Sequence, residues 1–75
     1  MIYSTHMLRH LRFIIGKNIR HHRGKRQLTL RKFARLSGIN ESRLDQFELG
    51  KNEIRLDELL KIACILEVQM EELIG

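Results

Sequence analysis

The sequence contains no proline, no tryptophan and a single cysteine, Cys64. One cysteine cannot form a disulfide within the chain, which argues against the disulfide-stapled class of small secreted domains. No apolar run approaches the ~20 residues that a membrane-spanning helix needs. The N-terminus also lacks the cation-then-apolar order of a signal peptide. These absences predict a soluble protein of the reducing cytoplasm, without a membrane partner.

Acidic residues are missing from the first forty positions, which hold ten Lys or Arg. Residues 41–75 hold nine Asp or Glu and four Lys or Arg, so the two parts carry +10 and −5 within a net charge of +5. A charge run is usually only a solvated face. Forty residues without one acid nevertheless favour a polyanionic partner, and double-stranded DNA is the partner we expect.

Groups that would support catalysis or metal binding are also scarce. His6 and His10 have the i, i+4 spacing of a metal pair, but no third ligand is evident. His22 falls in an apolar stripe, where a neutral core histidine is the simpler interpretation. Cys64 has no candidate base, because no histidine follows residue 22, and we interpret it as a buried apolar thiol. We therefore expect no enzyme activity, no cofactor and no metal.

Apolar residues recur at three- and four-residue spacings over most of the chain, which predicts an all-α fold. Seventy-five residues make one domain, near the lower size limit for a self-supporting core. Residues 1–7 are interpreted as a disordered lead-in and residues 8–75 as the folded domain. Pairing with a second copy would stabilise so small a domain.

Five helices are expected from these stripes and their caps. The first carries an apolar stripe that begins at Leu8, and it ends near Arg26. Thr29 and Asn40 are the predicted N-caps of the second and third helices, which each end at a glycine. The apolar residues expected on the inner faces of the last two helices are Leu56, Leu59, Leu60, Ala63 and Leu66, and then Met70, Leu73 and Ile74.

The link between the second and third predicted helices is only three residues long, from Gly38 to Asn40. So short a link, with an alanine four residues before the glycine and Leu44 six residues after it, is typical of a helix-turn-helix. In this spacing and in the order of the flanking residues, the chain resembles the Xre family of phage-repressor and Cro-like proteins. The matching positions, which span most of the chain, are Ile15-Gly16-Lys17, Arg20, Arg23, Leu28-Thr29, Phe33-Ala34, Gly38-Ile39, Leu44, Glu48, Gly50-Lys51, Leu56, Leu59-Leu60-Lys61-Ile62-Ala63 and Met70-Glu71-Glu72-Leu73.

The resemblance implies a compact five-helix, lambda-repressor-like domain that binds duplex DNA as a homodimer, with the helix over residues 40–49 in the major groove. It implies a transcriptional regulator of repressor type. Carried over position by position, base reading is assigned to Glu41, Ser42 and Gln46. Phosphate contacts are implied at Thr29, Leu30, Arg31, Arg43, Lys51 and Asn52.

Several positions depart from the family pattern. Leu30 replaces the usual Gln at the start of the second helix, which removes one phosphate hydrogen bond. Gln27 and Glu67 stand where a glycine commonly ends a helix. Ile54 replaces a frequent Pro, and Gln69 replaces a frequent Ser or Thr cap before the last helix. These departures weaken the predicted helix boundaries without contradicting the fold.

The predicted reading helix is acidic, which needs an explanation in a DNA-binding protein. At about 100° per residue, Ser42 and Gln46 lie on its outward face, whereas Glu41, Asp45 and Glu48 line the border between that face and the core. Two interpretations of Glu41 stay open. It accepts a hydrogen bond from a cytosine amino group, or it is a charge favoured by the helix N-terminus that touches no base.

Glu48 lies close to the apolar side of the same helix, almost within the core. Arg23 follows Ile19 by four residues on the first helix, where its long stem can pack and its guanidinium can reach a carboxylate. In the Xre-like domains that the chain resembles, these two positions form a buried ion pair. We therefore predict an ion pair between Arg23 and Glu48, against the alternative that Glu48 is a solvated charge.

Two questions stay open at the level of the sequence. Ile62, Ile65, Val68 and Met70 form a candidate dimer interface, for which a deeper place in the core is the alternative. The leading function is a sequence-specific transcriptional regulator. The alternative is an antitoxin or adaptor whose acidic half binds a basic protein partner, with DNA binding secondary.

Overall fold

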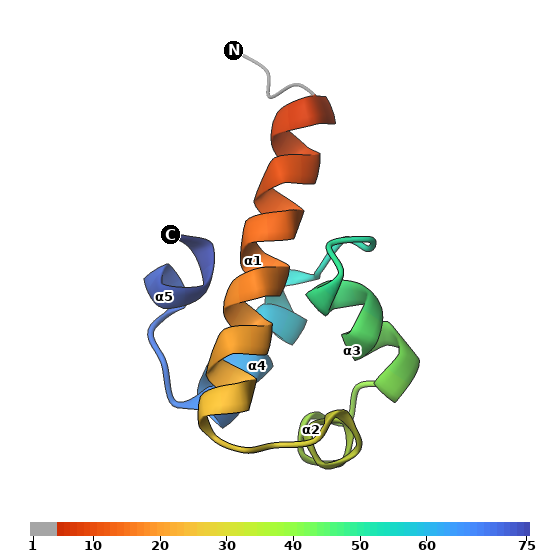
Figure 1. Cartoon of the computed structure of the whole chain (residues 1–75), viewed down its shortest axis with the longest axis vertical. Coiled ribbons are helices and arrows are strands. Elements are labelled where there is room, and N and C mark those ends of the chain that lie inside the picture. Colours follow the sequence, from red (N-terminus) through yellow and green to blue (C-terminus); the bar gives the residue numbers. More distant parts are fainter. Residues whose placement is uncertain (1–4) are drawn as a thin grey trace.

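The computed structural model describes residues 5–75, and it contains five α-helices and no strand within that range (Figure 1). In chain order the helices are α1 (Thr5–Lys25), α2 (Leu30–Ser37), α3 (Glu41–Glu48), α4 (Leu56–Leu66) and α5 (Met70–Ile74). The long helix α1 runs through the molecule, with α2 and α3 on one side of it and α5 on the other (Figure 1). The predicted all-α, five-helix fold is confirmed.

The helix α1 begins earlier than the sequence pattern predicts. It starts at Thr5 rather than at Leu8, so residues 5–7 of the expected lead-in are helical, while residues 1–4 lie outside the described residues. The first turns of α1 extend beyond the other helices (Figure 1), and Leu8 and Leu11 remain 43% and 39% exposed. The stripe meets the core only further along, at the partly buried Ile15 and the fully buried Ile19.

Side-chain caps fix the starts of α2 and α3. The Thr29 hydroxyl accepts a hydrogen bond from the Lys32 N–H at 3.0 Å, and the Asn40 side chain accepts one from the Ser42 N–H at 2.8 Å. Between the two helices, Gly38 adopts the left-handed conformation with φ 71°. Each such cap stabilises a helix by about 1 kcal/mol. Residues close together in the sequence therefore account for the conformation of this turn.

Two residues that replace common family glycines do adopt the conformation that favours glycine. Gln27 and Glu67 have φ values of 56° and 57°, in a region that costs an L-residue about 1 kcal/mol or more relative to glycine. Arg26 supports the second of these turns, since its Nε donates to the Leu66 carbonyl at 2.7 Å and its guanidinium lies 3.1 Å from the Glu67 carboxylate.

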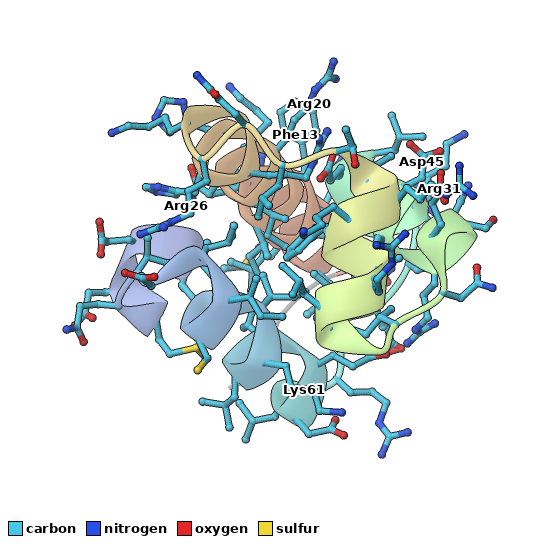
Figure 2. All side chains as sticks on the ribbon, turned by 90° about the horizontal axis from the view of Figure 1, so that it is seen from below. Phe13, Arg20, Arg26, Arg31, Asp45 and Lys61 are labelled. Atoms are coloured by element: carbon cyan, nitrogen blue, oxygen red, sulfur yellow. The ribbon has the colours of Figure 1, made fainter. Side chains whose placement is uncertain are left out.

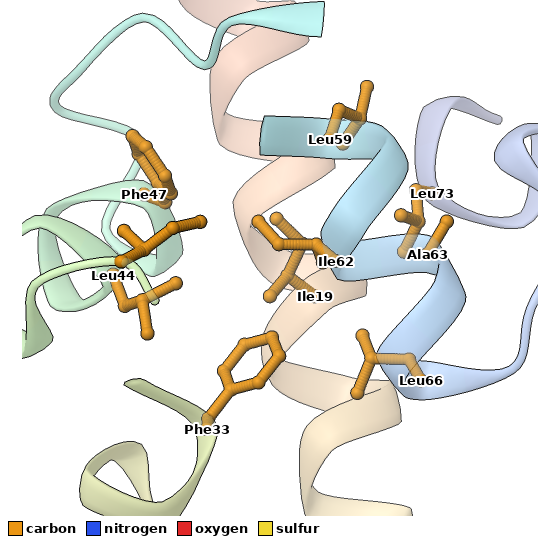
Figure 3. Close-up of a cluster of buried hydrophobic side chains, with 10 residues drawn as sticks. Ile19, Phe33, Leu44, Phe47, Leu59, Ile62, Ala63, Leu66 and Leu73 are labelled. Carbon is orange, nitrogen blue, oxygen red and sulfur yellow. The ribbon is translucent and has the colours of Figure 1, made fainter. Parts of the chain in front are cut away.

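The hydrophobic core draws side chains from all five helices (Figure 3). Phe33 of α2 and Phe47 of α3 are fully buried, as are Ile19 of α1, Ile62 of α4 and Leu73 of α5. Burying one large apolar side chain contributes about 1.5–3 kcal/mol. The remaining members of the core are Ile39, Leu44, Leu59, Ala63 and Leu66.

Part of the predicted inner face of α4 lies at the surface instead. Leu56 and Leu60 are 69% and 51% exposed, and Cys64 is exposed, so the expectation of a buried thiol is wrong. The reason is that α4 carries two apolar rows. The row that contains Leu59 and Ile62 packs in the core. The other row, formed by Leu56, Leu60 and Cys64, lies at the surface.

The candidate dimer interface also needs correction. Ile62 has no exposed surface in the single chain and belongs to the core, so it cannot contact a second copy. Ile65, Val68 and Met70 are half-buried and pack against the same core. The contacts of the short α5 with α1 and α4 hold this part of the chain against the core. The alternative of a deeper core position is therefore correct for Ile62.

No helix in residues 5–75 combines the length and the apolarity that crossing a membrane would require.

Two glycines of α1 give a matched test of how closely α1 and α3 approach. A Cβ atom at Gly16 would overlap the carbonyl oxygen of Phe47 and lie 2.9 Å from that of Glu48, whereas one at Gly24 meets nothing within 4 Å. We predict that Gly16→Ala lowers the free energy of unfolding by at least ~2 kcal/mol, through overpacking against backbone. Gly24→Ala should raise it by ~0.5–1 kcal/mol. Urea denaturation measures both, and equal effects would contradict the close contact.

Candidate nucleic-acid interface

The helix α3 separates its residues as the helical angles predict. Leu44 and Phe47 are fully buried in the core. On the outer side, Glu41 and Ser42 are exposed and Gln46 is half-exposed. All three residues predicted to read bases are therefore accessible from solvent on the side of α3 that faces away from the core.

A shallow hollow lies beside these residues, where α2 and α3 meet. It is lined by Leu30 of α2, the cap residue Asn40, and Glu41, Ser42 and Asp45 of α3. Figure 2 shows Arg31 and Asp45 at the same edge of the molecule, so the start of α2 and the outer side of α3 share one surface. A helix that reads a groove and a neighbouring helix that meets the backbone require this arrangement.

The residues expected to contact phosphate are placed unevenly. Thr29 and Arg31 at the start of α2 are exposed, as is Lys51 after α3, and Asn52 is half-exposed. Leu30 is different, because its side chain packs against the hydrophobic core. At that position only the backbone can contact a phosphate.

The predicted partners Arg23 and Glu48 lie together in the structure. The Arg23 Nε donates to Glu48 Oε2 at 2.6 Å, and a second guanidinium nitrogen donates to Oε1 at 3.0 Å. The side chains are only 17% and 4% exposed. This hydrogen-bonded carboxylate is the main reason that the pKa of Arg23 is raised above its usual value, with burial acting in the opposite direction.

Arg23 also connects a third part of the chain. Its remaining terminal nitrogen donates to the Leu28 carbonyl at 2.6 Å. One guanidinium on α1 therefore holds the end of α3 and the segment that leads into α2. Because three hydrogen bonds fix its direction, the two helices of the helix-turn-helix are both oriented relative to α1.

A second bidentate pair, between Arg43 and Glu58, was not predicted. Arg43 donates to the two Glu58 oxygens at 2.7 and 2.9 Å, and its guanidinium carbon lies 4.8 Å from the centre of the Phe47 ring. Glu58 also accepts a hydrogen bond from the Arg55 N–H at the start of α4. This geometry gives Arg43 a structural role between α3 and α4, while its side chain stays 37% exposed. The expected contact of Arg43 with phosphate stays a prediction.

The sequence gives a reason to expect Glu58 at a helix start, but no reason to expect Arg43 beside it. Glu58 stands three residues after Arg55, which is the spacing of a carboxylate that caps a helix start. Nothing local connects residues 43 and 58, which belong to different helices. The hydrogen bond with Arg43 is the main cause of the lowered pKa of Glu58, and burial opposes it.

His22 and the other candidate ligands do not form a metal site in the described part of the chain, where no group of three His, Cys, Asp or Glu residues is placed to hold an ion. His22 is half-buried, and its ring lies 5.1 Å from the ring of His21, edge to face. The expected core position of His22 is therefore only partly met.

The first prediction from this geometry concerns the buried pair. Glu48→Ala leaves the Arg23 charge buried without its partner, and we expect the free energy of unfolding to fall by ~3–5 kcal/mol. Asp45→Ala, an exposed acid on the same helix, should change it by less than about 0.5 kcal/mol. The double variant Arg23→Met, Glu48→Leu should recover part of the loss, because no charge is then buried. Urea denaturation distinguishes these outcomes. Equal losses of unfolding free energy in Glu48→Ala and Asp45→Ala would contradict the structural role of the Arg23–Glu48 pair.

The second prediction concerns pH. The pKa of Glu58 in the folded protein lies below its usual value of 4.5. Its pairing therefore stabilises the fold fully above the pKa of the unfolded chain, and this contribution is lost as the pH falls through the lowered folded pKa. Wild type should be more stable than Glu58→Gln near neutral pH, and the difference should shrink below about pH 4.5. Glu53→Gln, whose side chain is 76% exposed, is the control. A difference that does not depend on pH would exclude this role.

Comparisons with known proteins agree with this geometry. A helix-turn-helix family model matches residues 19–73, which includes all of α2, α3 and α4. Among solved structures, the restriction-modification controller protein C.AhdI from Aeromonas hydrophila is 29% identical, with a TM-score of 0.79, and the match covers 83% of this chain and 94% of that chain. No curated protein matches the chain. The chain therefore belongs to the Xre and lambda-repressor type of helix-turn-helix family, and it is a DNA-binding transcriptional regulator.

Proposed function

We propose that the protein is a sequence-specific, homodimeric regulator of repressor type that reads the major groove of duplex DNA with α3. The observation that carries this proposal is the accessible outer side of α3 on a helix held by two bidentate Arg–Glu pairs. A reading helix has to be held rigidly, because a misplaced hydrogen-bonding group cannot discriminate between bases.

Three side chains of α3 are proposed to read bases. Gln46 can bond the edge of an adenine in bidentate fashion, and Glu41 can accept from the amino group of a cytosine. Ser42, which is small and exposed, can bond a base edge or permit close approach of α3. A good base contact contributes about 1–3 kcal/mol of discrimination.

Phosphate contacts are proposed on either side of the reading helix. Thr29 and Arg31, together with the backbone N–H of Leu30, lie at the N-terminus of α2, where the partial positive charge of a helix favours an anion. Lys51 and Asn52 follow α3 and supply the second group. The predicted contact of Arg43 is not part of this proposal, because its guanidinium binds Glu58.

The similar protein C.AhdI is a restriction-modification controller protein. In line with a controlling role, we propose that this chain regulates transcription by binding at a promoter. Two reading helices related by a two-fold axis would bind half-sites about one helical turn apart. We propose that a dimer bound at such a site represses transcription by excluding the polymerase. The proposed function includes no catalytic step, because each residue assigned to the interface is proposed to bind a base or a phosphate.

One observation supports the alternative function, in which the protein is an antitoxin or an adaptor. The surface of the C-terminal part is acidic, with exposed carboxylates at Glu53, Glu67, Glu71 and Glu72. Such a surface suits a basic protein partner. Co-purification of a stoichiometric protein partner, together with weak binding to every duplex, would favour this alternative.

The proposed function predicts a characteristic dependence of DNA binding on salt. Duplexes selected in vitro from a random pool should bind roughly 10³-fold or more tightly than random sequence. The plot of log affinity against log salt should be steep, with a slope that reflects several neutralised phosphates. Fluorescence anisotropy over a salt series measures both quantities. A flat salt dependence would contradict DNA binding as the main function.

Two variants separate the proposed roles in the same experiment. Gln46→Ala should cost about 1–3 kcal/mol at one base pair and leave the slope unchanged, whereas Arg31→Ala should weaken all duplexes equally and reduce the slope by about one. Arg9→Ala is the matched control, because Arg9 is exposed on the first turns of α1, at the opposite end of that helix from α2 (Figure 1). A control that changes the slope as much as Arg31→Ala would exclude the proposed phosphate site.

A further inference from the structure

A row of apolar side chains on α4 faces solvent. Leu56 is 69% exposed, Leu60 is 51% exposed, and Cys64 is also exposed. Residues four apart on a helix are neighbours, so these three side chains form one continuous row, which we call the α4 stripe. Single exposed leucines are common in soluble proteins. A row along one helix, beside a separate row that fills the core, is typical of a surface that meets another molecule.

The α4 stripe points away from the DNA-reading helix. Leu60 and Glu58 lie about 160° apart around α4, and the Glu58 carboxylate binds Arg43 of α3. In Figure 2, Lys61, which adjoins the stripe, lies at a different edge of the molecule from Arg31 and Asp45. A molecule bound to the α4 stripe would therefore leave the outer side of α3 free.

The apolar surface continues beyond the stripe toward α1. Near the start of α4 a hollow opens between the two helices, lined by Leu8, Leu11 and Ile15 on one side and by Ile54 and Leu59 on the other, with the Arg12–Glu53 ion pair also in its lining. Leu8 and Leu11 are themselves 43% and 39% exposed.

We propose that the α4 stripe is the surface through which two copies of the chain pair, with their α4 helices antiparallel across a two-fold axis at Leu60. The proposal rests on the homodimer of the proposed function and names its interface. An antiparallel arrangement sets Leu60 against Leu60 of the second copy, and Leu56 against Cys64 of the second copy. The stripe is then complementary to itself, as a two-fold interface requires.

The charges beside the stripe favour this arrangement. Asp57 and Lys61 are both exposed and lie on the same flank of the stripe. When two helices pair antiparallel across a two-fold axis, the same flank of each copy lies on the same side, so Asp57 of one copy comes beside Lys61 of the other. Within one chain Asp57 is 3.3 Å from Arg55, in a surface pair whose carboxylate side chain is 60% exposed and remains accessible. A parallel arrangement would place these charges on opposite flanks, where they could not meet.

The geometry of packed helices makes the interface measurable by disulfide trapping. Helix axes in contact are about 8–10 Å apart and Cα atoms lie about 2.3 Å from each axis. The two Leu60 Cα atoms would therefore be ~3.5–5.5 Å apart, which overlaps the range that a disulfide spans. The two Leu56 Cα atoms would be ~12 Å apart along the axes, as would the two Cys64 Cα atoms, which is too far for a disulfide.

The test is oxidation of single-cysteine variants, followed by non-reducing electrophoresis. The variant Leu60→Cys, Cys64→Ala should form a disulfide-linked dimer. Wild type, which has only Cys64, and the variant Leu56→Cys, Cys64→Ala should remain unlinked under the same conditions. Leu36→Cys, Cys64→Ala is the control for random collision, because Leu36 on α2 is 52% exposed, like Leu60.

A second variant checks the interface without cysteine chemistry. Leu60→Lys would place two cations against each other at the two-fold axis. In sedimentation velocity it should weaken the dimer by at least ~30-fold, while far-ultraviolet circular dichroism shows an unchanged helix content. Leu36→Lys, at a matched exposure, should leave the dimer unaffected.

The outcomes separate the interface from the proposed function. If wild type sediments as a dimer but Leu60→Cys, Cys64→Ala does not crosslink and Leu60→Lys stays dimeric, the α4 stripe is not the interface and the homodimer stands. Crosslinking of wild type through Cys64 would overturn the antiparallel arrangement. If wild type is monomeric at every concentration, with and without its selected duplex, both the interface and the homodimeric function are wrong.

Discussion

The position of α3 depends on the buried ion pair between Arg23 of α1 and Glu48 of α3. Removing two charges from water costs several kcal/mol, which only close geometry offsets, so such a pair contributes orientation more than net free energy. Its third hydrogen bond, to the Leu28 carbonyl, extends the constraint to the entrance of α2. Close contact between α1 and α3 at Gly16 completes the same constraint, because a side chain there would push the two helices apart.

The architecture explains part of the acidity of α3. A glutamate of α3 binds an arginine of α1, and an arginine of α3 binds Glu58 of α4. Two Arg–Glu pairs therefore hold α3. Glu48 of α3 supplies the acid in one pair, and Glu58 of α4 supplies it in the other. Because Glu48 and Arg43 are paired inside the protein, long-range attraction to DNA has to come mainly from the cations of the first forty residues. Of those ten cations, Arg12, Arg23 and Arg26 are themselves paired with acids.

The helix α4 shows how one short element serves two surfaces. Leu59, Ile62, Ala63 and Leu66 fill the core, while the α4 stripe remains on the flank. A chain of 75 residues has little apolar area to spare, and area left outside the core is best explained by a second use. Because Glu58 at the start of the same helix holds α3, pairing through α4 would connect the dimer axis to the reading helix through one rigid element.

Features that depend on local chemistry could be predicted from the sequence. The caps at Thr29 and Asn40, the left-handed Gly38 and the angular separation of Ser42 from Glu48 follow from side chains a few residues apart, as does the helix-turn-helix that they build. The pair of Arg23 and Glu48 could be predicted only because the family resemblance supplied a contact between residues far apart in the sequence. Only the packing of the helices shows that Arg43 binds Glu58, that Ile62 belongs to the core, and that Leu60 and Cys64 face solvent. Helical periodicity gives the angle between two side chains on one helix, but the flank that meets a neighbour depends on where the other helices pack.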